Sequence, residues 1–273
     1  MPMRRLAVVG LVSLDRVDGG PPRLGGAVFY AAQTLRFLDQ TALIATKVAR
    51  DEEALGLQAI GLPVVYARAK RTIEFGIEND GDRRRLRIEE PGDGFTLADV
   101  RGWLAPALAG CDWVHAGALT RADFSAETLA ALRRGGRRLS FDGQGLVRSA
   151  GKGDVTLEGE YDPAMLEHVD LLKLSEEEAE ALGLGFDDRS LRSLGVKEVV
   201  VTLGKAGVIV YADGLAELAP TQPLEDVDPT GAGDTFIVAY LAYRRGGHSA
   251  PSAAGCANEA VKALIAQRAS RRT

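Results

Sequence analysis

The sequence predicts an α/β fold, a three-layer α/β/α sandwich with a mainly parallel central sheet and a small β lid. Two observations carry this prediction. Short apolar runs typical of buried strands alternate with helical stretches along nearly all of the 273 residues. The pattern changes at about residues 68–91, where polar and apolar residues alternate and a hairpin is expected. We therefore expect a single domain over residues 1–273, with this hairpin inserted as the lid.

Composition is that of a soluble globular protein and excludes several partners. Hydrophobic residues make up 46% of the chain and charged residues 26%, and the net charge of -5 argues against a nucleic-acid partner. The apolar run at residues 6–9 is too short for a signal sequence or a membrane span, so no membrane partner is expected. Cys111 and Cys256 show no metal-ligand spacing and form no disulfide framework. We expect a cytoplasmic protein, and the sequence leaves monomer and homodimer open.

The first strand is expected at residues 6–10, followed by a loop that carries Ser13 and Asp15. Open α/β sheets bind ligands outside the carboxyl ends of their strands, so Asp15 is a candidate to hold substrate hydroxyls. A loop-capping role is the alternative. Gly25 and Gly26 then open an apolar helix, and glycines at this place let the backbone approach a substrate closely.

The hairpin has its turn at residues 79–82, with Leu86 and Ile88 pointing inward. Inserted between helix–strand units, it would cover one side of a site, and an ordinary edge hairpin is the alternative. His115 lies inside an apolar strand and is assigned no role. The other elements are expected as strands at 41–49, 63–67, 112–116, 138–142, 169–174, 198–203 and 208–211, and as helices at 51–60, 96–108, 125–134 and 249–266.

Further polar groups follow strand ends. Gln144 and Arg148 come directly after the strand at 138–142 and can point into the same crevice as Asp15, although a plain loop is the alternative. Ser175 and Glu178 form a capping box at the start of a helix.

Two common nucleotide motifs are excluded. The turn at residues 204–207 reads Gly-Lys-Ala-Gly and lacks the Ser or Thr that a Walker A loop requires after its lysine, which excludes P-loop kinases. No Gly-x-Gly-x-x-Gly follows the first strand, which argues against a dinucleotide oxidoreductase.

The chemistry is expected in residues 226–243. Pro229 and two glycines mark a turn, and the apolar residues 236–243 mark a helix that is buried on all sides. A buried helix therefore begins just after a glycine-rich turn.

The start of this helix suits an anion. Gly231, Ala232 and Gly233 carry little or no side chain, so an anion can approach the unpaired amides at the positive end of the helix dipole. A carboxylate, Asp234, shares this place. Helix capping by Asp234 is the alternative, but it explains neither the small residues nor the second acid, Asp228.

The run Asp-Pro-Thr-Gly-Ala-Gly-Asp-Thr-Phe at residues 228–236 resembles the C-terminal signature of the ribokinase-like, or PfkB-type, carbohydrate kinases. This resemblance implies a phosphotransferase that uses ATP and Mg²⁺. It makes Asp234 the general base that takes the proton of the substrate hydroxyl, and it makes the amides of residues 231–233 an anion hole for the phosphoryl group.

The resemblance also implies roles elsewhere in the chain. Two departures from the family pattern are Tyr30 and Ser175, which stand where many members carry Asn, while Gln144 with Arg148 retained resembles the branch that includes inositol kinases. Glu178 would organise the magnesium ion through water. The implied substrate-binding residues are Asp15, Gly25, Gly26, Tyr30, Gln144 and Arg148, and the implied nucleotide-binding residues are Thr202, Gly204, Gly207, Thr230 and Asn258.

The expected activity is ATP-dependent phosphorylation of a hydroxyl on a small sugar or cyclic polyol, with a myo-inositol-like ring preferred. A nucleoside or ribose kinase of the same family is one alternative. A non-catalytic regulator that binds ATP or a polyol is another, and such a protein would be expected to lack the base or the anion hole.

Overall fold

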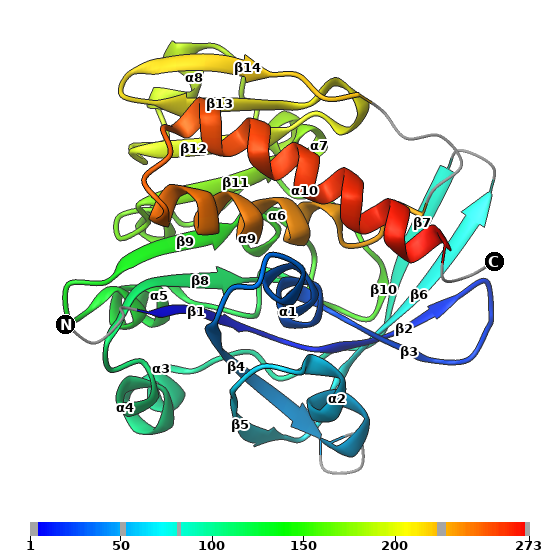
Figure 1. Cartoon of the computed structure of the whole chain (residues 1–273). Helices are drawn as coiled ribbons and strands as arrows, with labels where there is room; N and C mark the ends of the chain where they lie inside the picture. The colour runs from blue at the N-terminus through cyan, green and yellow to red at the C-terminus, as the bar shows by residue number, and fades with distance from the viewer. Residues whose placement is uncertain (1–4, 50–52, 81–82, 223–227, 271–273) are drawn as a thin grey trace.

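The computed structural model describes residues 5–49, 53–80, 83–222 and 228–270. Within these residues, a nine-stranded sheet lies between two layers of helices, and a five-stranded sheet lies at the end where α9 begins (Figure 1). The predicted three-layer α/β fold with a mainly parallel central sheet is confirmed.

The central sheet has the strand order β14-β13-β12-β11-β9-β8-β1-β4-β5. Neighbours from β12 to β5 are parallel, and β13 and β14 add an antiparallel edge that includes one strand the sequence did not predict. The inner strands are apolar because helices cover both of their faces. Their bounds are β1 (Arg5–Gly10), β4 (Ala42–Ala49), β5 (Val64–Ala69), β8 (Cys111–Gly117), β9 (Arg138–Asp142), β11 (Leu171–Ser175), β12 (Glu198–Thr202), β13 (Val208–Ala212) and β14 (Leu215–Ala219).

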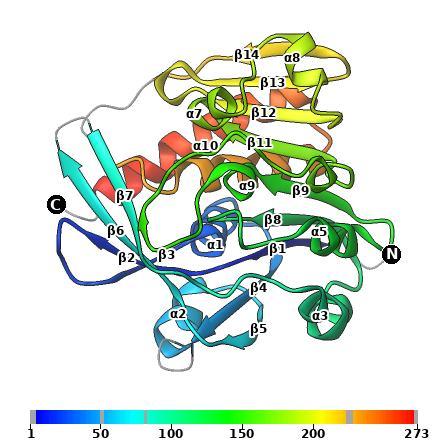
Figure 2. The ribbon, with the colours of Figure 1, turned by 180° about the vertical axis from the view of Figure 1, so that it is seen from behind.

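Helices form the two outer layers. One face of the sheet carries α1 (Ala27–Phe37), α2 (Glu53–Ile60), α9 (Ala232–Arg245) and α10 (Ala250–Ser270) (Figure 1). The opposite face carries the continuous helical stretch α3 (Leu97–Asp99), η2 (Val100–Leu104) and α4 (Ala105–Ala107), together with α5 (Ala126–Arg133), α7 (Glu176–Ala181) and α8 (Asp188–Arg192) (Figure 2). Short turns are α6 (Gln144–Val147), η3 (Pro163–Met165) and η4 (Gly204–Ala206).

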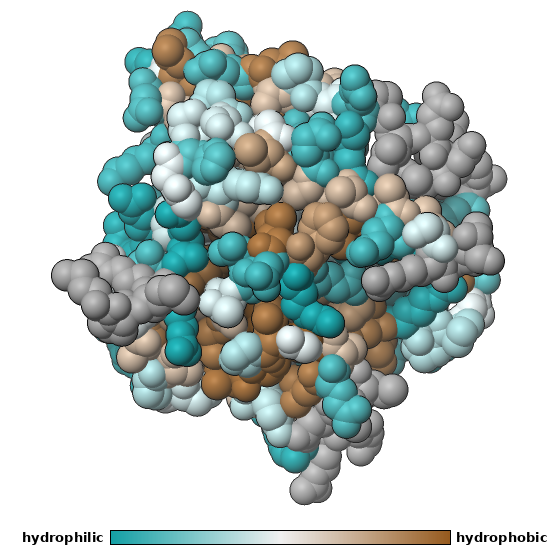
Figure 3. Space-filling view, viewed as in Figure 1, coloured by the Kyte–Doolittle hydropathy of each residue, from teal (hydrophilic) through white to brown (hydrophobic). Residues whose placement is uncertain are grey.

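The core consists of one apolar cluster on each face of the sheet. Successive residues of β1 alternate between them, because side chains along a strand point to opposite faces: Ala7 and Val9 lie in one cluster, Leu6 and Val8 in the other. Helix α9 is buried along residues 235–241, so the run 236–243 that was predicted to be buried on all sides is buried except at its last two residues. On the face of α1, α9 and α10, apolar side chains gather in the middle and lower part of the view, with polar side chains among them (Figure 3).

The five-stranded sheet, which we call the lid sheet, has the order β10-β7-β6-β2-β3. The expected hairpin is present as β6 and β7, with Ile77 opposite Leu86, although its turn residues 81–82 lie outside the described residues. Three strands that the sequence did not predict enlarge it. The bounds are β2 (Ser13–Val17), β3 (Arg23–Gly25), β6 (Ile73–Asp80), β7 (Arg83–Glu90) and β10 (Gly153–Asp154).

One expectation for the N-terminal segment was wrong. Ser13 and Asp15 lie in strand β2 and not in a loop, because residues 13–17 pair in parallel with β6 and so extend the lid sheet. No helix in the described part of the chain is both long enough and apolar enough to cross a membrane.

Candidate active site

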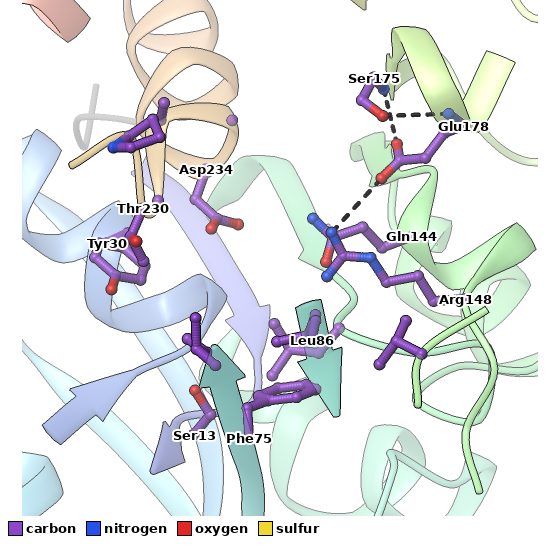
Figure 4. A pocket seen from close by; sticks show the side chains of 18 of the residues that line it. Ser13, Tyr30, Phe75, Leu86, Gln144, Arg148, Ser175, Glu178, Thr230 and Asp234 are labelled. Carbon is purple, nitrogen blue, oxygen red and sulfur yellow. Dashed lines mark hydrogen bonds and ion pairs between the residues drawn. The ribbon is translucent and has the colours of Figure 1, made fainter. Parts of the chain in front are cut away.

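A cavity of about 500 Å³ lies between the start of α9, the lid sheet, and the segments that follow β9 and β11. This is the crevice at the carboxyl ends of the parallel strands, where α/β sheets bind ligands. Figure 4 shows Asp234 pointing into it from α9, with Gln144, Arg148 and Glu178 on the opposite side and Phe75 and Leu86 of the lid sheet below. The fold thus brings residues from distant parts of the sequence, between Ser13 and Asp234, to one cavity.

Residues 231–233, which we call the glycine turn, start helix α9. Gly231 has φ +75 and ψ 12, a left-handed conformation that glycine adopts without strain. Before it, Asp228 accepts a hydrogen bond from the amide of Thr230 at 3.0 Å, and the amide of Ala232 donates to the carbonyl of Pro229 at 2.9 Å. The Ala232 amide is therefore paired within the turn, and residues 231–233 themselves carry no side chain larger than a methyl group.

Asp234 lies in the first turn of α9, and its Oδ1 is buried without a hydrogen-bond partner among the described residues. Burial, and next the nearby carboxylate of Asp142, raise the pKa of Asp234 from 3.8 to about 7, although Lys173 and Arg148 act in the opposite direction. A carboxylate that titrates near neutral pH and has an unpaired oxygen in a cavity is suited to accept a proton.

Asp15 faces the cavity from β2 and is 8% exposed. The hydroxyl of Ser13 donates to its Oδ1 at 2.7 Å. Gly25 leaves room for the carboxylate, since a Cβ on Gly25 would lie 2.2 Å from Asp15 Oδ2. Gly26, with φ +88, follows and lines the cavity. The two glycines therefore permit the close packing of β2, β3 and α1 around Asp15.

Tyr30 separates this cavity from a second one of about 890 Å³, because Asp15, Tyr30, Ile77 and Thr230 line both. Burial, with a further effect of Asp15, raises the pKa of the phenol, which stays neutral. The guanidinium of Arg268 lies 5.1 Å from the ring centroid. Arg268 also donates to the carbonyl of Thr230 at 3.1 Å, so the end of α10 holds both the ring and the segment before the glycine turn.

Gln144 and Arg148 approach from the opposite side. The segment after β9 forms the short helix α6, whose first amide, that of Gln144, donates to Asp142 Oδ1 at 3.1 Å. Gln144 Oε1 is buried without a partner among the described residues, and Arg148 is partly exposed to the cavity. An acceptor and a donor group therefore lie beside each other, as hydroxyl recognition requires.

Glu178 is both a capping residue and a cavity residue. Ser175 and Glu178 form the predicted capping box, in which Glu178 Oε2 accepts from the Ser175 amide at 2.8 Å. Glu178 is 2% exposed, and its carboxylate lies 4.0 Å from Arg148 Nη2 (Figure 4). No group of three or more metal-ligating side chains occurs among the described residues.

The residues expected on the nucleotide side are only partly at the cavity. Thr202 and Thr230 line it, while Gly204, Gly207 and Asn258 do not. Gly207 packs under β14, since a Cβ there would lie 2.3 Å from the carbonyl oxygen of Ala219. The buried Asn258 amide donates to that same carbonyl at 3.1 Å. Nucleotide contacts for these residues stay predictions.

Sequence reasoning missed two sets of cavity residues. Lys173 lies on β11 and is 2% exposed, and its signal was a charged residue inside an otherwise apolar strand. Val155 and Leu157 complete an apolar wall with Phe75, Ile77 and Leu86 of the lid sheet. They lie in a segment whose sequence shows no helical or strand periodicity, and their place depends on the pairing of β10 with β7.

Comparisons with known proteins agree with this fold. Residues 155–272 match the sequence profile of the pfkB family carbohydrate kinases. An inositol 3-kinase from Zea mays is 35% identical over 209 residues, which cover 74% of this chain and 50% of that protein. The chain thus spans about half the length of this relative.

Two solved structures are similar over nearly the whole chain. A pyrophosphate-dependent kinase in the ribokinase family, complexed with a pyrophosphate analog and myo-inositol, has 27% identity and a TM-score of 0.80 over 95% of this chain and 94% of its own. A pyrophosphate-dependent myo-inositol-1 kinase, converted into a myo-inositol-3 kinase by two substitutions, has 28% identity and a TM-score of 0.80. The match covers 95% of this chain and 92% of that kinase. The resemblance inferred from residues 228–236 is confirmed, with inositol kinases among the similar proteins.

Proposed function

Because this chain has the fold and the signature of the PfkB-type carbohydrate kinases, we propose that it transfers a phosphoryl group to a hydroxyl of a small cyclic polyol, myo-inositol or a ring like it. The observation that carries the proposal is the pairing of Asp234 with the glycine turn in one cavity. A general base and an anion site must both lie beside the reacting hydroxyl, and here the same helix start supplies both.

The reaction follows from this arrangement. The substrate hydroxyl gives its proton to the Asp234 carboxylate as its oxygen forms a bond to the phosphorus of the donor. The bond from that phosphorus to the bridging oxygen breaks, and the rest of the donor leaves with the electron pair. The Ala232 amide already donates to the Pro229 carbonyl, so the amides of Gly231 and Gly233 are the ones proposed to face the negative charge of the group in transfer and to stabilise the transition state.

The cavity walls favour a ring with hydroxyls at one edge and an apolar face. Asp15, Gln144 and Arg148 offer acceptors and a donor to hydroxyls, whereas the lid sheet with Val155 and Leu157 offers apolar contact. A volume of about 500 Å³ suits a small molecule. The inositol kinases among the similar proteins support the same acceptor. A nucleoside or ribose kinase is the alternative within the family.

The apolar wall bears on which hydroxyl reacts. In the similar myo-inositol kinase, two substitutions, both to leucine, change the position that is phosphorylated. This chain has Ile77 and Leu86 opposite each other on the lid hairpin and facing the cavity. We propose that these two apolar side chains contact one face of the ring and so help to select the hydroxyl that reacts. Closing of the lid sheet over the ring would exclude water from the transfer.

ATP is the proposed donor, and pyrophosphate is the alternative that the similar structures support. Thr202 at the end of β12 lines the same cavity as the glycine turn, and the phosphates of either donor are proposed to lie between them. Gly207 and Asn258 pack on the edge strands, so their proposed nucleotide role is to shape the backbone there.

Magnesium is proposed to be held through its water ligands. Carboxylate oxygens are the ligands that Mg²⁺ prefers, and Glu177 and Glu178 both line the cavity. Since Glu178 already accepts from the Ser175 amide and lies near Arg148, it fits a water-mediated contact better than a direct one. When bound, the ion supplies positive charge to the donor phosphates.

The test is a matrix of two donors and four acceptors. We would measure kcat/KM for myo-inositol, ribose, fructose and adenosine, with ATP and with pyrophosphate, under saturating magnesium. The proposal expects myo-inositol to exceed the other three by at least about tenfold with one donor, because a site built for hydroxyls rejects analogues that leave its polar groups unpaired. A preference for ribose, fructose or adenosine would overturn it.

A further inference from the structure

Lys173 is a buried charged residue at the cavity that the proposed reaction does not yet use. It lies in the middle layer of the fold on β11, with its side chain 3% exposed. Burial lowers the pKa of Lys173, but the carboxylates of Asp142 and Glu178 raise it, and the net effect is a raised pKa. The ammonium therefore keeps its charge. A fully charged ammonium is therefore fixed inside the protein.

The position of this ammonium is next to the glycine turn. A Cβ on Gly233 would lie 3.2 Å from Lys173 Nζ, so the ammonium fills the space that a side chain at residue 233 would need. Lys173 also lines the cavity together with the whole glycine turn and Asp234. Among the described residues that line this cavity, the basic ones are Lys173 and Arg148.

The carboxylates around Lys173 do not account for it fully. Its Nζ lies 3.7 Å from Asp142 Oδ2 and 3.7 Å from Glu178 Oε2. Both distances exceed the roughly 2.7–3.2 Å of a direct N–H···O hydrogen bond. These contacts neutralise charge, but they leave N–H donors for a third group at the cavity.

We propose that Lys173 is the cationic part of the anion hole and contacts the phosphoryl group during its transfer. The role of Lys173 in phosphoryl transfer rests on the proposed function. Its role in binding an anion rests on the position of Lys173 beside the glycine turn. The hydroxyl proton passes to Asp234 and the bond to the leaving oxygen breaks. During this step the Lys173 ammonium, which lies next to Gly233, faces the negative charge on the phosphoryl oxygens. Lys173 itself neither gains nor loses a proton.

Charge balance in the cluster gives a second consequence. Asp142, Glu178 and Asp234 face two cations, Lys173 and Arg148, and burial together with the charge of Asp142 raises the pKa of Asp234. Removing the Lys173 charge makes Asp234 harder to ionise, and removing the Asp142 charge makes it easier. The Asp234 shift follows from the Lys173 charge in either case, whereas a lysine that served packing alone would leave anion binding unchanged.

The experiment compares wild type with Lys173→Arg, Lys173→Met and the double variant Lys173→Met with Asp142→Asn. The double variant removes one cation and one anion together, and it guards against unfolding of the single variant around an unpaired buried carboxylate. Thermal unfolding establishes which variants fold. Two readouts follow: binding of pyrophosphate by calorimetry, and kcat and kcat/KM for myo-inositol from pH 5.5 to 9.

We expect Lys173→Met to bind pyrophosphate at least about tenfold more weakly and to lose about 10²–10³ in kcat, the range for loss of one donor to a transition-state anion. Its kcat/KM should rise at higher pH than in wild type. In the double variant, the pH at which kcat/KM rises should move back toward that of wild type, while kcat stays low. Lys173→Arg should keep anion binding and the pH profile.

A folded Lys173→Met or double variant with wild-type pyrophosphate affinity and kcat overturns the inference. Pyrophosphate binding tests the anion site of Lys173 independently of the proposed function. If wild type phosphorylates none of the acceptors, the proposed function fails, and weaker pyrophosphate binding by the methionine variants still supports the anion site.

Discussion

The ring of Tyr30 lies directly against Gly231. A Cβ on Gly231 would come within 2.3 Å of Tyr30 Cδ1, and the backbone there has φ +75. The residue that stands in place of the family's Asn is thus a support for the turn that would bind the phosphoryl group. Glycine at 231 is required twice, by its conformation and by this contact.

Gly231→Ala should therefore cost activity well beyond its effect on folding. The new methyl group must displace the Tyr30 ring and move the amides of the turn, for which we expect kcat/KM to fall at least about 10²-fold, as for a displaced transition-state donor. Gly247→Ala is the matched control, since Gly247 has φ +91 at the far end of α9 with open space around its Cβ position. An equal fall of kcat/KM in Gly231→Ala and Gly247→Ala would mean that backbone strain alone causes the loss of activity.

Tyr30→Ala should broaden the acceptor range. Removal of the ring joins the cavity of about 500 Å³ to its neighbour of about 890 Å³. The ratio of kcat/KM for adenosine to that for myo-inositol should rise at least about tenfold, because the wider site no longer excludes the larger acceptor. Tyr30→Phe keeps the ring against Gly231 and should leave the ratio near that of wild type. An unchanged ratio in Tyr30→Ala would show that the ring does not limit acceptor size.

Glu178→Gln should raise the magnesium concentration needed for half-maximal rate, since a charge is lost near the water shell of the ion. The capping contact to the Ser175 amide survives, because the glutamine oxygen can still accept it. Glu180→Gln, an exposed change on the same helix, is the control. A magnesium titration that matches wild type in both variants would leave Glu178 with a capping role alone.

Asp234→Asn should stabilise the protein above neutral pH. The folded-state pKa of Asp234, about 7, lies above the ordinary 3.8, so its contribution to stability is fully present below about pH 4 and is lost as pH rises through 7. Asparagine does not titrate, and its advantage over wild type should grow from pH 5 to pH 8, reaching at most about 4 kcal/mol. Denaturant unfolding at both pH values measures this. An advantage that did not grow with pH would contradict the raised pKa.

The sequence predicted the strands and helices of the central sandwich well, because their patterns are local. The strand at residues 6–10 and the buried helix after Pro229 appear where the apolar runs placed them. The lid sheet was only partly predictable. Strand β10 has two residues, and β2 is defined by its pairing with β6, so neither leaves a periodic signal.

The candidate site divides in the same way. Gln144, Arg148 and Glu178 reach the cavity, as their places after strand ends indicated, and Asp234 reaches it from the expected helix start. Asp15 also reaches it, but from strand β2 and not from the expected loop. Lys173 was missed because an apolar strand was interpreted as core, although a lysine in such a strand is rarely buried without a charged partner. Asn258 was expected at the nucleotide and packs on β14, a strand that the sequence pattern did not reveal.

The central claim is that Asp234 is the base for phosphoryl transfer to a cyclic polyol. The most direct test is kcat/KM for myo-inositol in wild type and Asp234→Asn, with both proteins shown to be folded and to bind the donor. We predict a loss of at least the ~10²–10⁴-fold typical of general-base removal, with donor affinity retained. Turnover by Asp234→Asn at the wild-type rate would contradict the claim.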